Sequence, residues 1–213
     1  MQPPKAIAMG DSLIYGYGDP DGGGWVERLR RQWMRPEQAG PILYNLGVRG
    51  DGVSQVLQRW EAEFFCRGEL RNRQPDILLL SVGVNDSARL GKPDGKNFTD
   101  FDGYCSALTE LLARARQQCP VWMVGMIPVE EARMPFFECF YYSHAEQYRY
   151  KEAAKQMCCE RQIPYLDLFD LWLARGSNWR SARMCPDGLH PNTVGYESIL
   201  QDVSAWWGSF PNM

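Results

Sequence analysis

Three residues of this sequence have types suited to nucleophilic catalysis. Ser12 lies in MGDSLIYGYG, directly after a short apolar run, and Asp187 and His190 lie three residues apart in CPDGLHPNTVGY. At that spacing a carboxylate can bond one imidazole nitrogen and leave the other free to take a serine proton. Taken singly, Ser12 is better explained as a helix N-cap, and the DxxH segment is equally compatible with a solvated turn. The other histidine, His144, is expected in the first turn of a helix and outside any chemistry.

Hydrogen-bond donors follow two further apolar runs. Asn85 lies in GVND, and its side-chain amide can donate to a negatively charged oxygen. The segment NLGVRGDG at residues 45–52 contains glycines that let a backbone N–H come close to a substrate. Because Asn and Asp after a strand are usually turn residues, each of these signals is weak by itself. Asp11 and Asp86 are expected to hold their loops by accepting backbone N–H bonds.

Alternating apolar runs and helical patterns predict the framework for these residues. Five apolar runs are expected to be buried strands, at residues 6–9, 42–46, 76–82, 121–127 and 163–168. Between them, apolar residues recur at helical spacing over residues 25–33, 53–64, 104–115 and 196–207. This alternation predicts a parallel sheet with helices on both faces. Ligands bind beyond the carboxyl ends of such strands, which are followed here by the loops at residues 10–24, 83–103 and 128–143.

The composition excludes several classes of protein. The chain has 213 residues, 45% of them hydrophobic, which favours a single domain over residues 1–213. A net charge of −3 with scattered Lys and Arg does not suit a nucleic-acid binder. No apolar run reaches the ~20 residues of a membrane span, and no signal peptide is visible, so a cytoplasmic location is expected. The seven cysteines lack disulfide or zinc spacing and are interpreted as mostly buried free thiols.

Taken in order along the chain, the polar segments resemble the SGNH hydrolase family, also called GDSL esterases. GDSL is matched at residues 10–13, GxND at residues 83–86, and DGLHPN at residues 187–192, with a Gly-Tyr pair shortly after it. The segment IPYLDLF at residues 163–169 is similar to the family's fifth strand. The resemblance covers nearly the whole chain and implies a flavodoxin-like, three-layer α/β/α sandwich with a five-stranded parallel sheet.

The resemblance implies a serine hydrolase and assigns roles within it. Ser12 would be the nucleophile, His190 the general base, and Asp187 the residue that orients the base. The oxyanion hole would consist of the backbone N–H groups of Ser12 and of a glycine, together with the side-chain amide of Asn85. The segment NLGVRGDG at residues 45–52 leaves this glycine open among Gly47, Gly50 and Gly52, and Gly50 is preferred.

The expected activity is hydrolysis of a small or medium acyl ester through an acyl-enzyme, with a small-molecule substrate and no metal or cofactor. Two histidines are too few for a catalytic zinc site with several histidine ligands. The same triad would serve a thioesterase, a lysophospholipase or an acyltransferase, and these alternatives stay open. A nucleotide or flavin binder would need a P-loop or a GxGxxG motif, and the glycines at residues 16–24 complete neither. A binding module without catalysis is disfavoured by the intact catalytic residues.

An aromatic segment follows the fourth predicted strand. Five aromatic residues lie within positions 136–142, which is unusual for a solvated loop. Because this segment leaves the sheet at the edge expected for Ser12, Phe136, Phe137 and Phe140 are predicted to line an apolar substrate pocket. Such a pocket would admit short or medium acyl chains and exclude long ones. Packing of the segment onto the domain explains any single one of these rings equally well.

Overall fold

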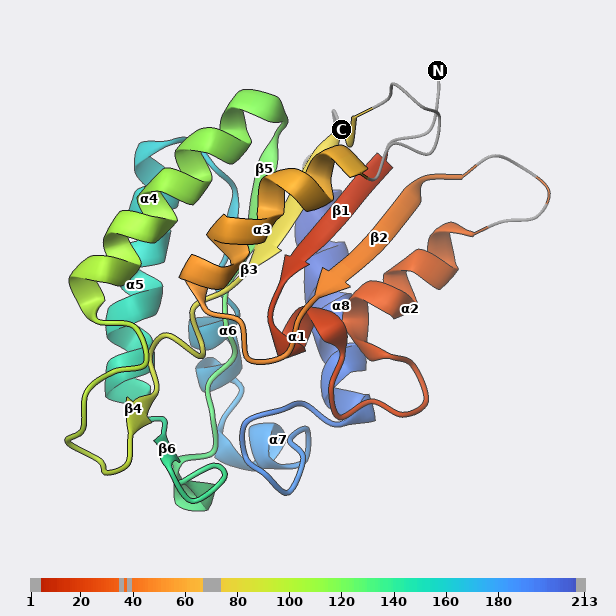
Figure 1. Ribbon diagram of the computed structural model, residues 1–213. Coiled ribbons are helices and arrows are strands. Elements are labelled where there is room, and N and C mark those ends of the chain that lie inside the picture. Colours follow the sequence, from red (N-terminus) through yellow and green to blue (C-terminus); the bar gives the residue numbers. More distant parts are fainter. Residues whose placement is uncertain (1–4, 35–36, 38–39, 67–73, 210–213) are drawn as a thin grey trace.

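A five-stranded parallel sheet forms the centre of the computed structural model, which describes residues 5–34, 37, 40–66 and 74–209 (Figure 1). The strands are β1 (Lys5–Gly10), β2 (Ile42–Gly47), β3 (Ile77–Ser81), β5 (Val121–Val124) and β7 (Tyr165–Leu166). They pair in the order β2-β1-β3-β5-β7, and every pairing is parallel. The predicted five-stranded parallel sheet is thus confirmed. Residues 1–4 and 210–213 of the predicted domain lie outside the described residues.

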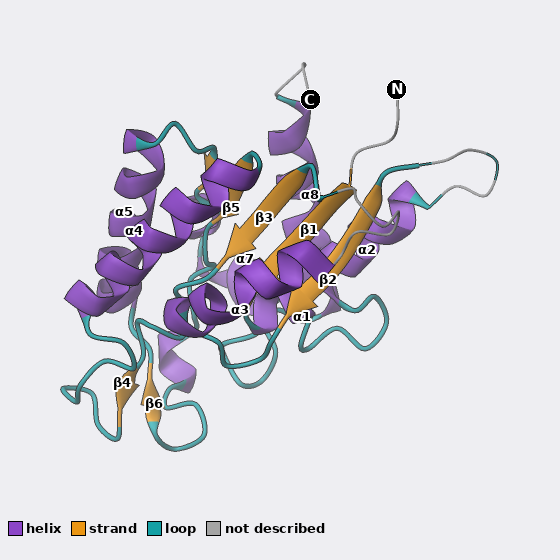
Figure 2. Cartoon of the chain, turned by 45° about the horizontal axis from the view of Figure 1, so that its top comes forward, coloured by secondary structure: helices purple, strands orange, loops and turns teal. Residues whose placement is uncertain are grey.

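Helices cover both faces of this sheet (Figure 2). One face carries α3 (Val53–Cys66) and α4 (Phe101–Gln118), with α5 (His144–Glu160) packed beside α4, and the other carries α2 (Gly24–Trp33) and α8 (Thr193–Gly208). The remaining helices are short: α1 (Ser12–Tyr15), η1 (Glu131–Arg133), α6 (Leu168–Ala174) and α7 (Ser177–Ser181). The three layers confirm the predicted sandwich. Within the described residues, no helix combines the length and the apolar character needed to cross a membrane.

The core explains why the strands are continuously apolar. All residues of β1 and β3 are buried, because each of these strands has helices on both of its faces. Large rings from the covering helices reach the sheet, and Trp25, Trp60, Tyr104 and Tyr196 are almost completely buried. Burial of a large apolar side chain stabilises the fold by roughly 1.5–3 kcal/mol. These contacts fix the positions of the strand ends that carry the polar residues.

The fourth predicted strand, residues 121–127, is shorter than expected. Its neighbour β7 ends at Leu166, and the N–H of Gly125 donates the last strand-to-strand bond to the Leu166 carbonyl, at 2.9 Å. Beyond this point the backbone bonds to the buried side chain of Gln147 on α5. The Gln147 amide donates to the carbonyl of Ile127 at 2.9 Å, and its oxygen accepts the N–H of Val129. A side chain therefore replaces the missing strand partner.

Other short elements also differ from the prediction. The fifth strand spans Tyr165–Leu166 and not residues 163–168, because the Asp167 side chain accepts the N–H of Asp170 and starts α6 there. A separate antiparallel pair joins β4 (Arg89–Leu90) to β6 (Phe140–Tyr141). This pair links the loop after β3 to the aromatic segment after β5, and it lies below the main sheet in Figure 2.

All seven cysteines lie in the described part of the chain and are free thiols, as predicted, but most of them are not buried. Cys119 and Cys158 are buried, whereas the others are partly or fully exposed: Cys66, Cys105, Cys139, Cys159 and Cys185. Cys66 and Cys159 lie in the last turns of α3 and α5, where the helix surface is open to solvent. The prediction of mostly buried thiols was wrong, because cysteine type does not say which side of a helix faces the core.

Candidate active site

Ser12 lies at the turn between β1 and α1. The N-cap of α1 is Asp11, whose Oδ1 accepts the N–H of Leu13 at 2.8 Å. Ser12 is the first helical residue, so its own N–H has no partner within the helix. The explanation of Ser12 as a helix N-cap was therefore wrong. With the cap supplied by its neighbour, the Ser12 hydroxyl is available for another contact.

A chain of two hydrogen bonds joins the three residues predicted for nucleophilic chemistry. His190 Nε2 lies 2.9 Å from Ser12 Oγ, and His190 Nδ1 lies 2.8 Å from Asp187 Oδ2. Partial burial by itself would raise the pKa of the Asp187 carboxyl. Hydrogen bonds from the His190 ring and from the N–H groups of His190 and Leu189 outweigh burial, and they hold this pKa below its usual value. An ionised Asp187 fixes the proton on Nδ1 and leaves Nε2 as the acceptor for the serine hydroxyl.

The loop that presents His190 is held by its own backbone and by a close approach of the loop after β1. The N–H of Cys185 donates to the carbonyl of His190 at 2.8 Å, and the Asn192 side chain caps α8. Gly18 has φ +100°, and a Cβ there would lie 2.5 Å from the carbonyl oxygen of Pro191. Only glycine allows this contact without displacement of the loop. Two loops far apart in sequence therefore position the Ser12–His190 pair.

The three candidate glycines differ in what their N–H groups do. The N–H of Gly47 donates to Asn45 Oδ1 at 3.0 Å, and the N–H of Gly52 donates to Gln55 Oε1 at 3.0 Å. Gly50 has φ +83°, and its N–H has no acceptor among the described residues. Of the three, Gly50 alone has a backbone donor left for a ligand in this part of the chain.

Asn85 is almost buried, with 9% of its surface exposed, and its amide is held from both sides. One Nδ2 hydrogen goes to the carbonyl of Asp51 at 2.9 Å, and Oδ1 lies 3.3 Å from the hydroxyl of Tyr142. A primary amide has two donor hydrogens, so one of them remains unused by these contacts. The bond to the Asp51 carbonyl fixes the orientation of the Asn85 amide. Its second N–H hydrogen is available to a ligand in the cavity that Asn85 lines.

A cavity of about 350 Å³ opens beside these groups. Its polar lining includes Ser12, Gly50, Asn85 and His190, and its apolar lining includes the three predicted phenylalanines, Phe136, Phe137 and Phe140. Phe137 stands at the rim with 68% of its surface exposed. The structure thus brings the polar residues from four separate chain segments to one hollow with an aromatic wall.

The model of the GDSL-like Lipase/Acylhydrolase family matches residues 8–197. The chain belongs to this family. Among solved structures, a lipase/acylhydrolase from Enterococcus faecalis is 18% identical with a TM-score of 0.74, covering 95% of this chain and 94% of the other. An acetylxylan esterase from Geobacillus stearothermophilus is 17% identical with a TM-score of 0.71, covering 98% and 97%. These likenesses show a shared fold. No curated protein sequence matched the chain.

Two buried acids of this GDSL-family chain hold the loops around the cavity without lining it. Burial raises the pKa of the Asp11 carboxyl to about 7, although the N–H of Leu13 lowers it in part. Burial likewise raises the pKa of Asp86, against the lowering effect of bonds from the Thr99 hydroxyl and the N–H of Val53. Their contacts agree with the structural role expected for both residues.

Some residues at the cavity were not singled out from the sequence. Arg49, Tyr142, Phe98 and Leu189 also line it. Tyr142 belongs to the aromatic run and Arg49 directly precedes the preferred glycine, so both had a positional signal. Phe98 and Leu189 had none, because a lone apolar residue in a loop does not indicate what it faces.

His144 does not reach the cavity. It begins α5, as expected, and its Nε2 lies 2.8 Å from the carbonyl oxygen of Val129. Its Nδ1 is 3.5 Å from a carboxylate oxygen of Glu131, and its ring meets the edge of Phe169. These contacts account for the imidazole without a catalytic role.

Among the described residues, one group of side chains could offer three oxygen atoms to a metal ion. Glu152, Asp167 and Asp170 lie close together on α5 and at the start of α6. The buried ammonium of Lys151 lies 2.7, 3.0 and 2.6 Å from them in that order. The lysine already supplies the positive charge, so this cluster is an ion-pair network that ties α5 to α6.

Proposed function

We propose that this GDSL-family chain is a serine ester hydrolase that works through an acyl-enzyme. The observation that supports it most directly is the hydrogen-bond chain from Ser12 through His190 to Asp187 at the wall of the cavity. Family membership supports an acylhydrolase, and two of the similar structures are a lipase/acylhydrolase and an acetylxylan esterase.

In the proposed reaction, Ser12 Oγ attacks the ester carbonyl while His190 Nε2 takes the hydroxyl proton. Asp187 stabilises the imidazolium that forms and keeps the ring in its orientation. The carbonyl oxygen becomes an oxyanion that accepts bonds from the N–H groups of Ser12 and Gly50 and from the free amide hydrogen of Asn85. Collapse of this intermediate breaks the bond to the alcohol, which leaves with the proton from His190.

The second half of the reaction repeats these steps with water. His190 takes a proton from a water molecule, which attacks the acyl group on Ser12. The oxyanion forms in the same place, and its collapse returns the proton to Ser12 Oγ as the carboxylic acid departs. The acyl group would lie against Phe136, Phe137 and Phe140, and we propose that these rings select short or medium chains.

The test is a series of p-nitrophenyl esters from acetate to palmitate. Ser12→Ala is expected to lower kcat by about 10⁴- to 10⁶-fold, because the nucleophile is lost. It should keep the unfolding temperature of the parent protein and lose labelling by a fluorophosphonate. Ser106→Ala, an exposed serine on α4, is the matched control and should behave as the parent. Turnover that survives in Ser12→Ala would place the reaction elsewhere.

A further inference from the structure

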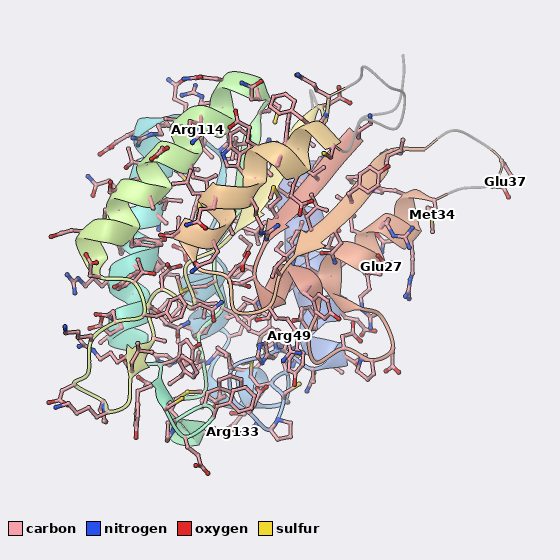
Figure 3. The ribbon with its side chains drawn as sticks, in the orientation of Figure 1. Glu27, Met34, Glu37, Arg49, Arg114 and Arg133 are labelled. Atoms are coloured by element: carbon pink, nitrogen blue, oxygen red, sulfur yellow. The ribbon has the colours of Figure 1, made fainter. Side chains whose placement is uncertain are left out.

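A cation with unused donors stands at the mouth of the cavity. Arg49 is exposed, directly precedes Gly50 and lines the same hollow as Ser12. Within the described ranges, its guanidinium makes no hydrogen bond or ion pair. Figure 3 labels this side chain below the ends of the central strands, near α1. The five N–H donors of the group are therefore open to a ligand.

Ring contacts connect Arg49 to His190 through Tyr17. Its guanidinium carbon lies 3.9 Å from the centroid of the Tyr17 ring, in cation–π contact. The Tyr17 ring in turn meets the His190 ring edge-on at 4.6 Å, and the Tyr17 carbonyl accepts the hydroxyl of Tyr196 at 2.9 Å. The Phe136 ring contacts His190 as well, at 5.7 Å between centroids. The His190 imidazole thus contacts two rings. One is Tyr17, which is in cation–π contact with Arg49, and the other is Phe136 of the aromatic wall.

Three carboxylates that lie close along the chain to Arg49, Tyr17 or His190 are engaged with other partners. Asp51, two residues after Arg49, lies 2.7 Å from the guanidinium of Arg59. Asp19 lies 2.8 Å from that of Arg28. Asp187 is bonded to His190, as described above. None of these acids forms an ion pair with Arg49, so a positive charge without an ion-pair partner among the described residues stands at the cavity mouth.

We propose that Arg49 binds an anionic group of the substrate. The substrate is then an ester with a carboxylate or phosphate on one side of its carbonyl and an apolar group on the other. A planar guanidinium pairs two N–H donors with two oxygens of such a group, a geometry that a neutral polar group cannot match. This inference rests on the proposed esterase function and adds the class of ester to it.

The experiment measures kcat/KM for neutral and anionic esters in matched sets. On the alcohol side, phenyl acetate is compared with 4-acetoxybenzoate and with 4-acetoxyphenyl phosphate. On the acyl side, p-nitrophenyl hexanoate is compared with p-nitrophenyl hydrogen adipate. Arg49→Gln is expected to lower kcat/KM about 5- to 10-fold for the anionic esters of one set and to leave the neutral esters within about twofold. The set that responds identifies the side that carries the charge.

Two further measurements separate a charge effect from a packing effect. Added salt should slow the parent protein on the responding anionic ester and leave Arg49→Gln unaffected, because exposed charges are screened. Arg49→Lys should retain part of the selectivity, since it keeps the charge without the planar fork. The control is Arg116→Gln, an exposed arginine at the end of α4 and outside this cavity, which should match the parent.

The outcomes distinguish this inference from the proposed function. If the parent hydrolyses the neutral esters and Arg49→Gln changes neutral and anionic esters equally in both sets, Arg49 is not an anion site and the inference fails alone. If the parent hydrolyses none of the esters, the proposed function fails and the inference falls with it. A larger loss on neutral than on anionic esters would also overturn it, because that result indicates packing on Tyr17.

Discussion

The two sides of the cavity are built in different ways. On the polar side, Ser12, Asn85 and His190 are 5%, 9% and 3% exposed, and each has a hydrogen-bond partner from a distant segment. On the aromatic side, residues 134–142 leave the sheet after β5, and Phe137 is 68% exposed. The rings there contact one another, with Phe136 and Phe137 at 4.2 Å between centroids.

We infer from this difference that the polar side positions the reacting groups and that the aromatic side selects the acyl group. Hydrogen bonds are directional and fix atoms to within a few tenths of an ångström, which a proton transfer and an oxyanion require. Contacts between rings are much less directional, so an aromatic wall can accept several acyl groups of similar size. We therefore expect substitutions on the polar side to change rate, and substitutions on the aromatic side to change which ester reacts fastest.

Among variants that leave Ser12, His190 and Asp187 in place, the largest effect is expected for Asn85→Ala. Loss of this proposed oxyanion donor should lower kcat by about 10²- to 10³-fold, with a much smaller change in KM, because such a bond forms fully only in the transition state. Tyr142→Phe removes only the hydroxyl that faces Asn85 Oδ1 and should give a smaller loss of the same kind. Steady-state kinetics check both, with Asn178→Ala, an exposed asparagine, as control. An unchanged kcat in Asn85→Ala would remove the amide from the reaction.

The next effect concerns Asp11, the buried acid that directly precedes Ser12 in the chain. The Asp11 pKa is about 7 in the folded protein, against 3.8 for a fully solvated aspartate, so between these values the folded chain holds a proton that the unfolded chain lacks. This contribution to stability is fully present below about pH 4 and is lost as pH rises to 7. Asp11→Asn keeps an oxygen acceptor for the N–H of Leu13 and cannot ionise. Between pH 5 and pH 8 the parent should lose about 2–3 kcal/mol of unfolding free energy relative to this variant.

Urea unfolding of both proteins across this pH range gives the difference directly. Groups that titrate in both proteins cancel in that difference, which isolates Asp11. Parallel stability curves would mean that Asp11 keeps its charge in the folded protein, and that its burial is relieved by a contact absent from this structure.

On the aromatic side, Phe140→Ala and Phe137→Ala should shift the preferred acyl length upward. Each methylene that the enlarged space admits adds up to ~0.8 kcal/mol, or about fourfold in kcat/KM. The p-nitrophenyl ester series measures the shift, and Phe65→Ala, an exposed phenylalanine on α3, is the control. A profile that keeps its peak while only the unfolding temperature falls would make these rings packing residues.

The smallest effect is expected for His144→Ala. Its ring contacts the Val129 carbonyl and lies outside the cavity, so kcat should remain within about twofold of the parent value. His190→Ala, measured beside it, should lose nearly all activity. Equal losses in the two variants would mean that the reaction needs His144 as much as it needs His190.

The sequence by itself determined the sheet and the order of its polar ends. A continuous apolar run such as residues 77–81 is buried on both faces because helices flank it, and this requirement is visible in residue type alone. The motifs around Ser12 and Asn85 follow such runs, and the motif around His190 precedes the last helix. A parallel sheet brings the ends of its strands to one edge, whatever the conformation of the loops. The helices with one apolar face were equally accessible from their spacing.

Only the tertiary structure decided which polar groups are free and which are occupied. The N–H groups of Gly47 and Gly52 meet side-chain acceptors, whereas that of Gly50 meets none within the described residues. Asp11 caps α1, which leaves the Ser12 hydroxyl available. Arg59 pairs with Asp51, and Arg49 has no ion-pair partner within the described residues. Hydrogen bonds and ion pairs depend on distances of a few ångströms between segments far apart in the chain. Residue type sets which groups can bond, and the packing of the loops alone sets which of them do.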